Sequence, residues 1–371
     1  MEQPHVNATS EPVQFGDTTI TGIDGARGIL TYRGFRINDV VQHLGYEATA
    51  GLLLWGTRPG DPDARDLEAE LRTRRGLTSG LERVVEALPP GTRPIDGFRT
   101  VVSAMDDVAR RYPPTADEAL NVIARCPTLV TRLCQRSAGA EGPDPDPELG
   151  HVANYLWMLQ GARPSPERIR ALERYFVLLA DHGMSASTFA LRIVLSTRSD
   201  LASGVSAALG ALKGPLHGGA PPEVLEMLDA AGSVDQVEAW IDRTLEQRGR
   251  LFGFGHPTYR VEDPRATLLR GYAKEVAAPD RYALAQRFEQ VALERLAQRR
   301  PDQPLFTNVD FYGALLLEGV GIPRELFTPT FALARTAGWS AHALEQVAQN
   351  RMVRPPDRYF GPAPRPWDDS G

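Results

Sequence analysis

Most of the chain carries apolar residues at the spacing of amphipathic helices. One run, closed by Gly249, places its apolar side chains on a single helix face: Val234, Val237, Ile241 and Leu245. A longer run further on repeats this spacing: Leu284, Phe288, Val291, Ala292 and Leu296. Apolar residues at such intervals share one face of an α-helix. The pattern therefore predicts a protein that is helical almost throughout.

Three parts of the chain depart from the helical pattern. Thr18–Ile20 and Gly28–Tyr32 are β-like, and the turn residues Asp24-Gly25 lie between them, which predicts a small hairpin. Residues 137–150 have the Gly, Pro and Asp content of a loop. The proline-rich end from Arg354 onward cannot be helical for long.

Composition narrows the class of protein. The 371 residues are 42% hydrophobic and 24% charged, as in soluble globular proteins, and suffice for one large or two ordinary domains. The net charge of −6 argues against a general nucleic-acid partner. No apolar stretch approaches the ~20 residues of a membrane span, and Met1–His5 lacks the pattern of a signal peptide. We therefore expect a cytoplasmic protein.

The two cysteines agree with a reducing compartment. Cys126 and Cys134 lie eight positions apart in a segment with helical spacing, so roughly 12 Å of helix rise separates them. A disulfide needs Cα atoms about half that far apart. Both cysteines are expected to be free thiols.

Three short segments combine chemically active side chains with small or rigid neighbours: Lys213–Ala220, Gly253–Arg260 and Asn308–Tyr312. They hold His217, His256 and Asp310, respectively. A carboxylate base with two imidazole donors suits carbon-acid chemistry, because one group removes a proton while the others stabilise oxygens where negative charge develops. Any one segment alone would fit ordinary polar residues at loop edges, but the three together indicate an enzyme.

These segments resemble the citrate synthase family, and further segments in the same order extend the resemblance from roughly residue 15 to residue 367: Ile23–Gly34, Ala180–Thr188, Leu326–Pro329, Ala334–His342 and Arg354–Pro362. The resemblance implies an all-α, two-domain fold that closes over a cleft. Residues 1–217 and 316–371 would form the large domain, and residues 218–315 the small one.

The resemblance also assigns roles to the three central side chains. Asp310 would take a proton from the methyl group of an acyl-CoA thioester, His217 would stabilise the enol, and His256 would polarise the ketone of a 2-oxo acid. His217 precedes Pro221-Pro222, which looks like a helix start. Because a helix N-terminus disfavours a second cation, His217 should be a neutral donor.

The remaining expected site residues also follow from the resemblance. Ser187 would orient His217 through a hydrogen bond. Oxaloacetate would be held by four residues whose cationic or donor groups suit carboxylates: His182, Arg265, Arg335 and Arg354. Arg354 would reach the site of the other subunit in a homodimer. Coenzyme A would contact Lys213, Gly253, Gly255 and Arg260.

Two departures from the family pattern stand beside these residues. Pro257-Thr258 follows His256, where Arg-Val or Ala-Val is common, and proline removes an N–H and fixes φ. Gly183 and Ser185 replace a frequent Glu and Asn near His182. Both departures bear on the fit of the substrate.

The resemblance therefore predicts an acyltransferase that condenses acetyl-CoA, oxaloacetate and water to citrate and CoA. One alternative is 2-methylcitrate synthase, which uses propionyl-CoA, since one methylene changes discrimination by only ~1–3 kcal/mol. Another is a non-catalytic relative that binds a dicarboxylate. The sequence has no Walker A loop, dinucleotide fingerprint or metal-ligand spacing, so no metal or redox cofactor is expected.

Overall fold

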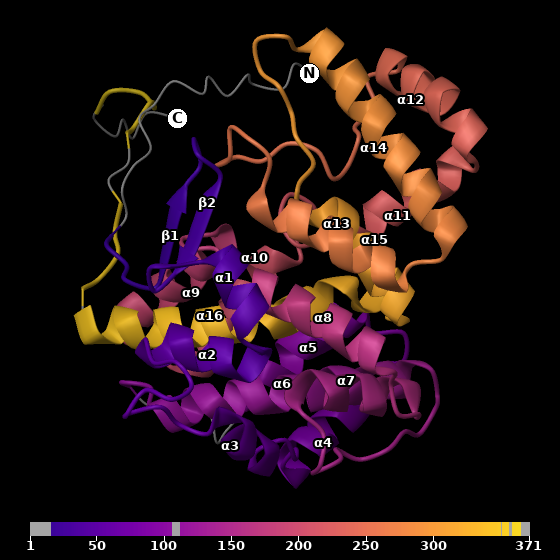
Figure 1. Cartoon of the computed structure of the whole chain (residues 1–371). Coiled ribbons are helices and arrows are strands. Elements are labelled where there is room, and N and C mark those ends of the chain that lie inside the picture. Colours follow the sequence, from indigo (N-terminus) through magenta and orange to yellow (C-terminus); the bar gives the residue numbers. More distant parts are fainter. Residues whose placement is uncertain (1–15, 106–111, 350, 356–357, 365–371) are drawn as a thin grey trace, which may run out of the picture.

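The structure, a computed structural model, describes residues 16–105, 112–349, 351–355 and 358–364. The described residues form sixteen α-helices and one small sheet (Figure 1), which confirms the all-α prediction. The helices that precede His217 are α1 (Ile37–His43), α2 (Tyr46–Trp55), α3 (Leu67–Thr73), α4 (Ser79–Ala87), α5 (Pro94–Val102), α6 (Ala116–Ser137), α7 (His151–Gln160), α8 (Pro166–Leu179), α9 (Ala186–Ser196) and α10 (Leu201–Leu212). Those that follow it are α11 (Ala220–Ala231), α12 (Val237–Glu246), α13 (Pro264–Val276), α14 (Pro279–Arg299), α15 (Val309–Val320) and α16 (Phe327–Gln349).

The sheet near the N-terminus is an antiparallel hairpin with a short third strand: β1 (Thr21–Asp24), β2 (Ile29–Tyr32) and β3 (Phe35–Arg36). The predicted first strand, Thr18–Ile20, is wrong because pairing begins after Ile20. The carboxylate of Asp24 accepts the N–H groups of Ala26 and Arg27, so the turn starts only at Asp24. This turn sets the register, and the four residues that end at Asp24 pair with β2.

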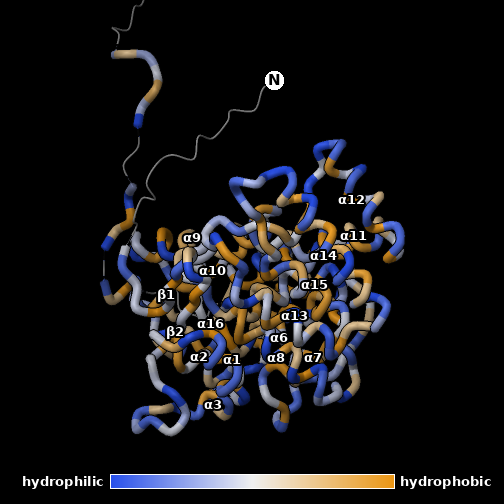
Figure 2. Tube along the Cα trace, turned by 45° about the horizontal axis from the view of Figure 1, so that its top comes forward, coloured by the Kyte–Doolittle hydropathy of each residue, from blue (hydrophilic) through white to orange (hydrophobic). Residues whose placement is uncertain are grey.

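Helix α16 passes through the middle of the molecule, where α2, α6, α8 and α9 pack on it (Figure 1). It is buried on nearly all sides, and its buried residues include polar ones such as Arg335 and His342. Figure 2 shows the hydrophobic segments gathered around this centre, with hydrophilic segments toward the outside. No helix among the described residues is long and apolar enough to cross a membrane.

The two strongest helical patterns have different outcomes. The run from Leu284 to Leu296 lies on α14 with its apolar side chains buried, as predicted. The other run begins three residues later than predicted, because Val234–Gln236 form a separate 3-10 turn and Val234 is 42% exposed. The helix ends at Glu246, before the predicted Gly249. The predicted loop 137–150 begins one residue too early, because Ser137 ends α6; residues 138–150 connect α6 and α7.

Helices α11 to α15 lie together on one side of the molecule (Figure 1), and α13 and α15 pack against α8. This grouping agrees with a second domain at residues 218–315, although the boundary itself stays a prediction. Cys126 and Cys134 both lie on α6 as free thiols, as expected.

The backbone of α16 makes a close contact with the segment that enters the site. Gly338 donates its N–H to the carbonyl of Ala180 at 3.1 Å. A Cβ at Gly338 would lie 2.4 Å from that oxygen and 2.4 Å from a carboxylate oxygen of Asp181. Only glycine permits this approach.

We therefore expect Gly338→Ala to lower the free energy of unfolding by about 1–3 kcal/mol, because the added methyl group overpacks a buried contact. Gly271→Ala is the matched control, since Gly271 lies on an exposed face of α13 with nothing within 4 Å of a Cβ. The control should raise stability by roughly 0.5–1 kcal/mol. Urea unfolding measures both variants, and a neutral Gly338→Ala would contradict the close approach.

Candidate active site

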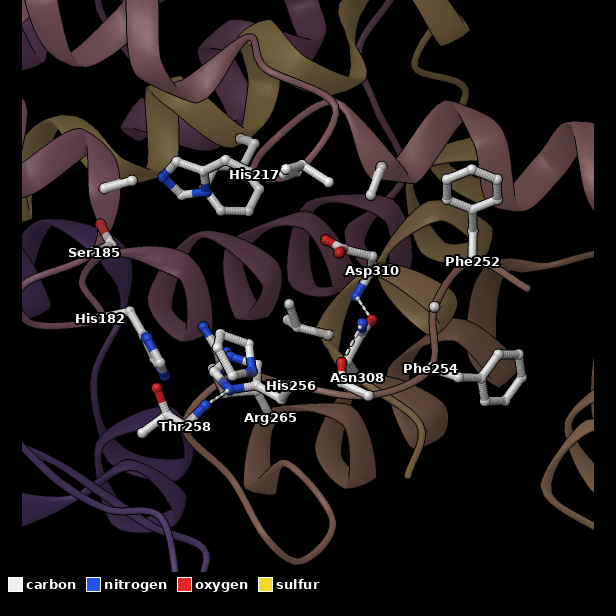
Figure 3. A pocket seen from close by; sticks show the side chains of 18 of the residues that line it. His182, Ser185, His217, Phe252, Phe254, His256, Thr258, Arg265, Asn308 and Asp310 are labelled. Carbon is white, nitrogen blue, oxygen red and sulfur yellow. Dashed lines mark hydrogen bonds between the residues drawn. The ribbon is translucent and has the colours of Figure 1, made fainter. Parts of the chain in front are cut away.

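The three segments singled out in the sequence line one cavity of about 530 Å³. His217 precedes α11, His256 lies in the loop before α13, and Asp310 lies in the first turn of α15. Figure 3 shows these three side chains around a common space. Further predicted residues line the same cavity: His182, Gly253, Gly255, Arg265 and Arg335. The segments therefore converge in space, as carbon-acid chemistry requires.

His217 is oriented by a hydrogen bond from its own chain. Its Nε2 lies 2.8 Å from the hydroxyl of Ser187, which is the contact expected from the sequence. The indole N–H of Trp339 donates to the same hydroxyl at 3.3 Å. Ser187 therefore keeps its own hydrogen, and when it donates this hydrogen to Nε2 the imidazole proton of His217 lies on Nδ1. No described residue bonds to this Nδ1, so it can donate to a ligand.

His217 is neutral, as predicted, but chiefly for another reason. Burial and, to a smaller extent, the positive charge of Arg335 together lower the pKa of His217 to about 4. The expected cause was the N-terminus of α11, whereas the causes found are loss of solvent and the charge of Arg335. The ring therefore acts as a hydrogen-bond donor at neutral pH rather than as a cation.

His256 is oriented by its own loop, which bonds to Nδ1 of the ring, whereas His217 is held at Nε2. Its Nδ1 accepts the N–H groups of Thr258 at 3.0 Å and Tyr259 at 3.3 Å. Pro257 has no N–H, so the loop folds back to offer the next two. Burial and, to a smaller extent, the charge of Arg265 together lower the pKa of His256 to about 4. The ring is therefore neutral, with its proton on Nε2.

The loops that carry His256 and Asp310 are joined by backbone hydrogen bonds. Gly255 donates to the carbonyl of Phe306 at 2.7 Å, and Asn308 donates to that of Gly253 at 2.9 Å. Gly253 has φ +85°, and a Cβ there would lie 2.8 Å from the Cβ of Phe311. Glycine at this position is thus required by the packing of the two loops, apart from any ligand.

Asp310 is a carboxylate with an unusual pKa. Its backbone N–H bonds to the side chain of Asn308, which caps α15. Burial raises the pKa of Asp310 to about 7, against the opposing effect of Arg265. No described residue donates a hydrogen bond to its carboxylate oxygens. A general base with a pKa near neutrality is well matched to proton abstraction.

Two buried arginines give the cavity positive charge. Arg265 is 2% exposed and forms a bidentate pair with Asp263, with distances of 3.0 and 2.7 Å. Arg335 is 1% exposed, and its Nε donates to the carbonyl of Leu179 at 2.6 Å. No described carboxylate forms an ion pair with Arg335. A buried cation without a counter-ion favours an anionic ligand.

His182 completes this positive side of the cavity. Its Nε2 lies 3.2 Å from the hydroxyl of Tyr259, and its ring centre lies 5.3 Å from that of His256. Burial and the charge of Arg265 hold the pKa of His182 well below its usual value. The imidazole is therefore the third neutral ring in the cavity, and it lies beside two guanidinium groups.

The two departures near His182 have structural explanations. Gly183 adopts φ +55°, which a glutamate would reach only with strain, and its N–H donates to the carboxylate of Asp181 at 2.8 Å. The hydroxyl of Ser185 lies 3.4 Å from Arg335 and 3.1 Å from Thr188. Ser185 thus lines the cavity beside its unpaired cation.

Three of the residues predicted to bind substrate do not line the cavity. Lys213 pairs with Asp96 at 2.5 Å, which leaves its assignment to coenzyme A without structural support. Arg260 is exposed, and its backbone N–H bonds to Gly25. Arg354 is also exposed. A single chain therefore does not bring these three to the other site residues.

The sequence reasoning missed four residues that the structure places in or beside the site: Arg250, Phe252, Tyr259 and Asp263. Arg250 stacks on Phe252 at 5.2 Å, and both line the cavity. Asp263 could have been found, because an Asp two residues before Arg265 and directly before a proline is a typical helix cap. Tyr259 carries no comparable signal.

Comparison with known proteins agrees with this geometry. The family pattern described as "Citrate synthase, C-terminal domain" matches residues 9–356. The chain belongs to the citrate synthase family. The resemblance stated from the sequence is thereby confirmed.

Several family members match over almost their whole length. The citrate synthase of Acidithiobacillus ferridurans is 37% identical over 97% of each chain. The solved citrate synthase of Thermotoga maritima has a TM-score of 0.86 with 33% identity and covers 98% of both chains. That of Thermoplasma acidophilum, solved in a ternary complex with carboxymethyl coenzyme A and oxaloacetate, has a TM-score of 0.88 with 28% identity.

Proposed function

We propose that this protein condenses acetyl-CoA with oxaloacetate and water to give citrate and CoA. The observation that carries the proposal is that two residues line the same cavity. One is Arg335, a buried cation without a counter-ion, and the other is Asp310, a carboxylate base with a pKa of about 7. The cation suits the binding of a dicarboxylate, and the carboxylate base suits the removal of a proton from a weakly acidic C–H group. The citrate synthases that match this chain over nearly its whole length support the same reaction.

The first step forms the enol of the thioester. Asp310 takes a proton from the methyl group of acetyl-CoA while the Nδ1–H of His217 donates to the carbonyl oxygen. A neutral donor stabilises the developing charge without giving up its proton in the resting state. The hydrogen bond from Ser187 keeps the Nδ1–H in place during this step.

The second step joins the two substrates. His182, Arg265 and Arg335 bind the carboxylates of oxaloacetate, and the Nε2–H of His256 polarises its ketone. The enol carbon attacks the ketone carbon, and the new alkoxide takes its proton from Nε2 of His256. Water then hydrolyses the thioester and releases CoA.

The assembly is part of the proposal. Residues 218–315 form a small domain that closes on the large domain and keeps the enol from water. The protein is a cytoplasmic homodimer, in which the proline-rich tail carries Arg354 to the oxaloacetate bound by the partner subunit. The exposed position of Arg354 on its own chain is compatible with this role.

We expect wild-type protein to release CoA from acetyl-CoA only when oxaloacetate is present. Asp310→Asn should lower kcat by at least about 10²-fold, because the amide cannot accept the methyl proton. Calorimetry should still detect oxaloacetate binding. Asp280→Asn is the matched control: the same change in the first turn of an exposed helix end, α14, should leave turnover unchanged.

The alternatives give different results in the same assay. Faster CoA release from propionyl-CoA than from acetyl-CoA would identify a 2-methylcitrate synthase instead. Oxaloacetate binding without CoA release from either thioester would identify a non-catalytic relative. Turnover by Asp310→Asn within a few-fold of wild type would remove Asp310 as the base.

The pH dependence should report the same carboxylate. Because Asp310 must be ionised and its pKa is about 7, kcat/KM for acetyl-CoA should fall about tenfold per pH unit as the pH drops below 7. His217 and His256, with pKa values of about 4, should add no second inflection between pH 5 and 7. A flat profile over this range would contradict the assignment.

Mixed dimers test the shared site. An Asp310→Asn chain still has the wild-type Arg354, and an Arg354→Ala chain still has the wild-type Asp310. Each variant alone should be nearly inactive, whereas co-expression should rebuild one intact site per mixed dimer. Mixed dimers that form but stay as inactive as their parents would show that Arg354 acts within its own chain.

A further inference from the structure

A buried polar network lies behind the cavity, on helices α9 and α16 and on the segment between α8 and α9. Its members are almost fully buried: Asp181, Arg192, His342 and Gln346 are all at most 3% exposed. None of them lines the cavity. Such a cluster of buried polar groups is costly unless every hydrogen bond is made, so a change in one member disturbs the others.

One end of the network fixes the segment that holds His182. A carboxylate oxygen of Asp181 accepts the N–H of Gly183 at 2.8 Å and faces Nε2 of His342 at 3.2 Å. His182 lies between the two residues joined by the first of these bonds. The orientation of Asp181 therefore sets the position of a residue that lines the cavity.

Arg192 fixes the state of His342. Its Nη1 donates to Nδ1 of His342 at 3.0 Å, so this imidazole carries its proton on Nε2, toward Asp181. The same nitrogen donates to Glu345 at 2.7 Å, and the resulting ion pair is almost fully buried. Arg192 is thus the centre of the network.

The other end of the network holds the start of the C-terminal tail. The Nε of Arg192 donates to the side chain of Gln346 at 2.9 Å, and Gln346 donates to the carbonyl of Arg351 at 2.9 Å. One turn beyond Arg192 on α9, Ser196 accepts the N–H of Val353 at 3.0 Å. The tail is therefore anchored up to the residue directly before Arg354.

We propose that Arg192 and Gln346 are positioning residues that serve two active sites at once. Through His342 and Asp181 the network places His182 in its own site, and through Gln346 it places Arg354 for the partner's site. The inference rests on the proposed function and its shared site. It adds that the same buried groups hold two parts of the chain in place. One is the segment with His182, here called the substrate segment, which belongs to the chain's own site, and the other is the tail with Arg354, which belongs to the partner's site.

The mixed dimer described above separates the two roles. Its single intact site is built on the Arg354→Ala chain, here the body chain, and is completed by the tail of the Asp310→Asn chain, here the tail chain. A further substitution can be placed in either chain. Its effect then reports on the substrate segment or on the tail, respectively.

Arg192→Gln should raise KM for oxaloacetate roughly fivefold in either placement, the cost of about one net hydrogen bond. Gln346→Met removes the link to the tail and also the hydrogen bond from Nε of Arg192, while Nη1 of Arg192 keeps its bond to His342. It should therefore raise KM more when placed in the tail chain than in the body chain. KM for acetyl-CoA should stay unchanged throughout. A general loss of stability would not change KM for one substrate only, nor would its effect depend on which chain carries the substitution. Thermal unfolding of each variant measures any such loss of stability.

An effect of Arg192→Gln in the body chain alone, or an equal effect of Gln346→Met in both chains, would overturn the inference. If Arg192→Gln does not fold, the placement effect of Gln346→Met decides. A mixed dimer without activity overturns the shared site and the inference with it. Absence of CoA release by the wild-type chain would instead refute the proposed function.

Discussion

Loss of solvent around the cavity acts in opposite directions on its imidazoles and its carboxylate, and the proposed chemistry depends on both effects. Burial disfavours any charged form, so it lowers the pKa of His217 and His256 to about 4 and raises that of Asp310 to about 7. In water the same side chains would give partly charged imidazoles and a carboxylate too weakly basic to remove a methyl proton. One physical condition thus yields two neutral donors and one effective base.

Burial sets the charges, whereas local partners set the directions. Ser187, when it donates to Nε2, leaves the proton of His217 on Nδ1. The backbone N–H groups of Thr258 and Tyr259 leave that of His256 on Nε2. Arginines keep their charge even when buried, so Arg335 can offset a dicarboxylate within the same cavity. The site therefore combines rigid neutral donors with a fixed cation, and neither needs to reorganise when charge develops on a substrate.

The sequence was sufficient for the parts of the molecule whose signal is local. The apolar spacing of α14 gave its buried face, and the glycine-flanked histidines gave two of the three central residues. Contacts between distant residues could not be read in the same way. Arg192 and His342 are 150 positions apart, and only the packing of α9 on α16 brings them together. Lys213 has a basic side chain in a suitable segment, yet a carboxylate from α5 pairs with it.

The most direct test of the account is the state of the two imidazoles, measured by ¹⁵N NMR of histidine-labelled protein. Variants of His217 and His256 assign their signals among the seven histidines. The account predicts that both rings stay neutral from about pH 8 to about pH 5, with the proton on Nδ1 in His217 and on Nε2 in His256. Protonation of either ring near the ordinary histidine pKa of about 6.5, or the reverse pair of tautomers, would contradict it.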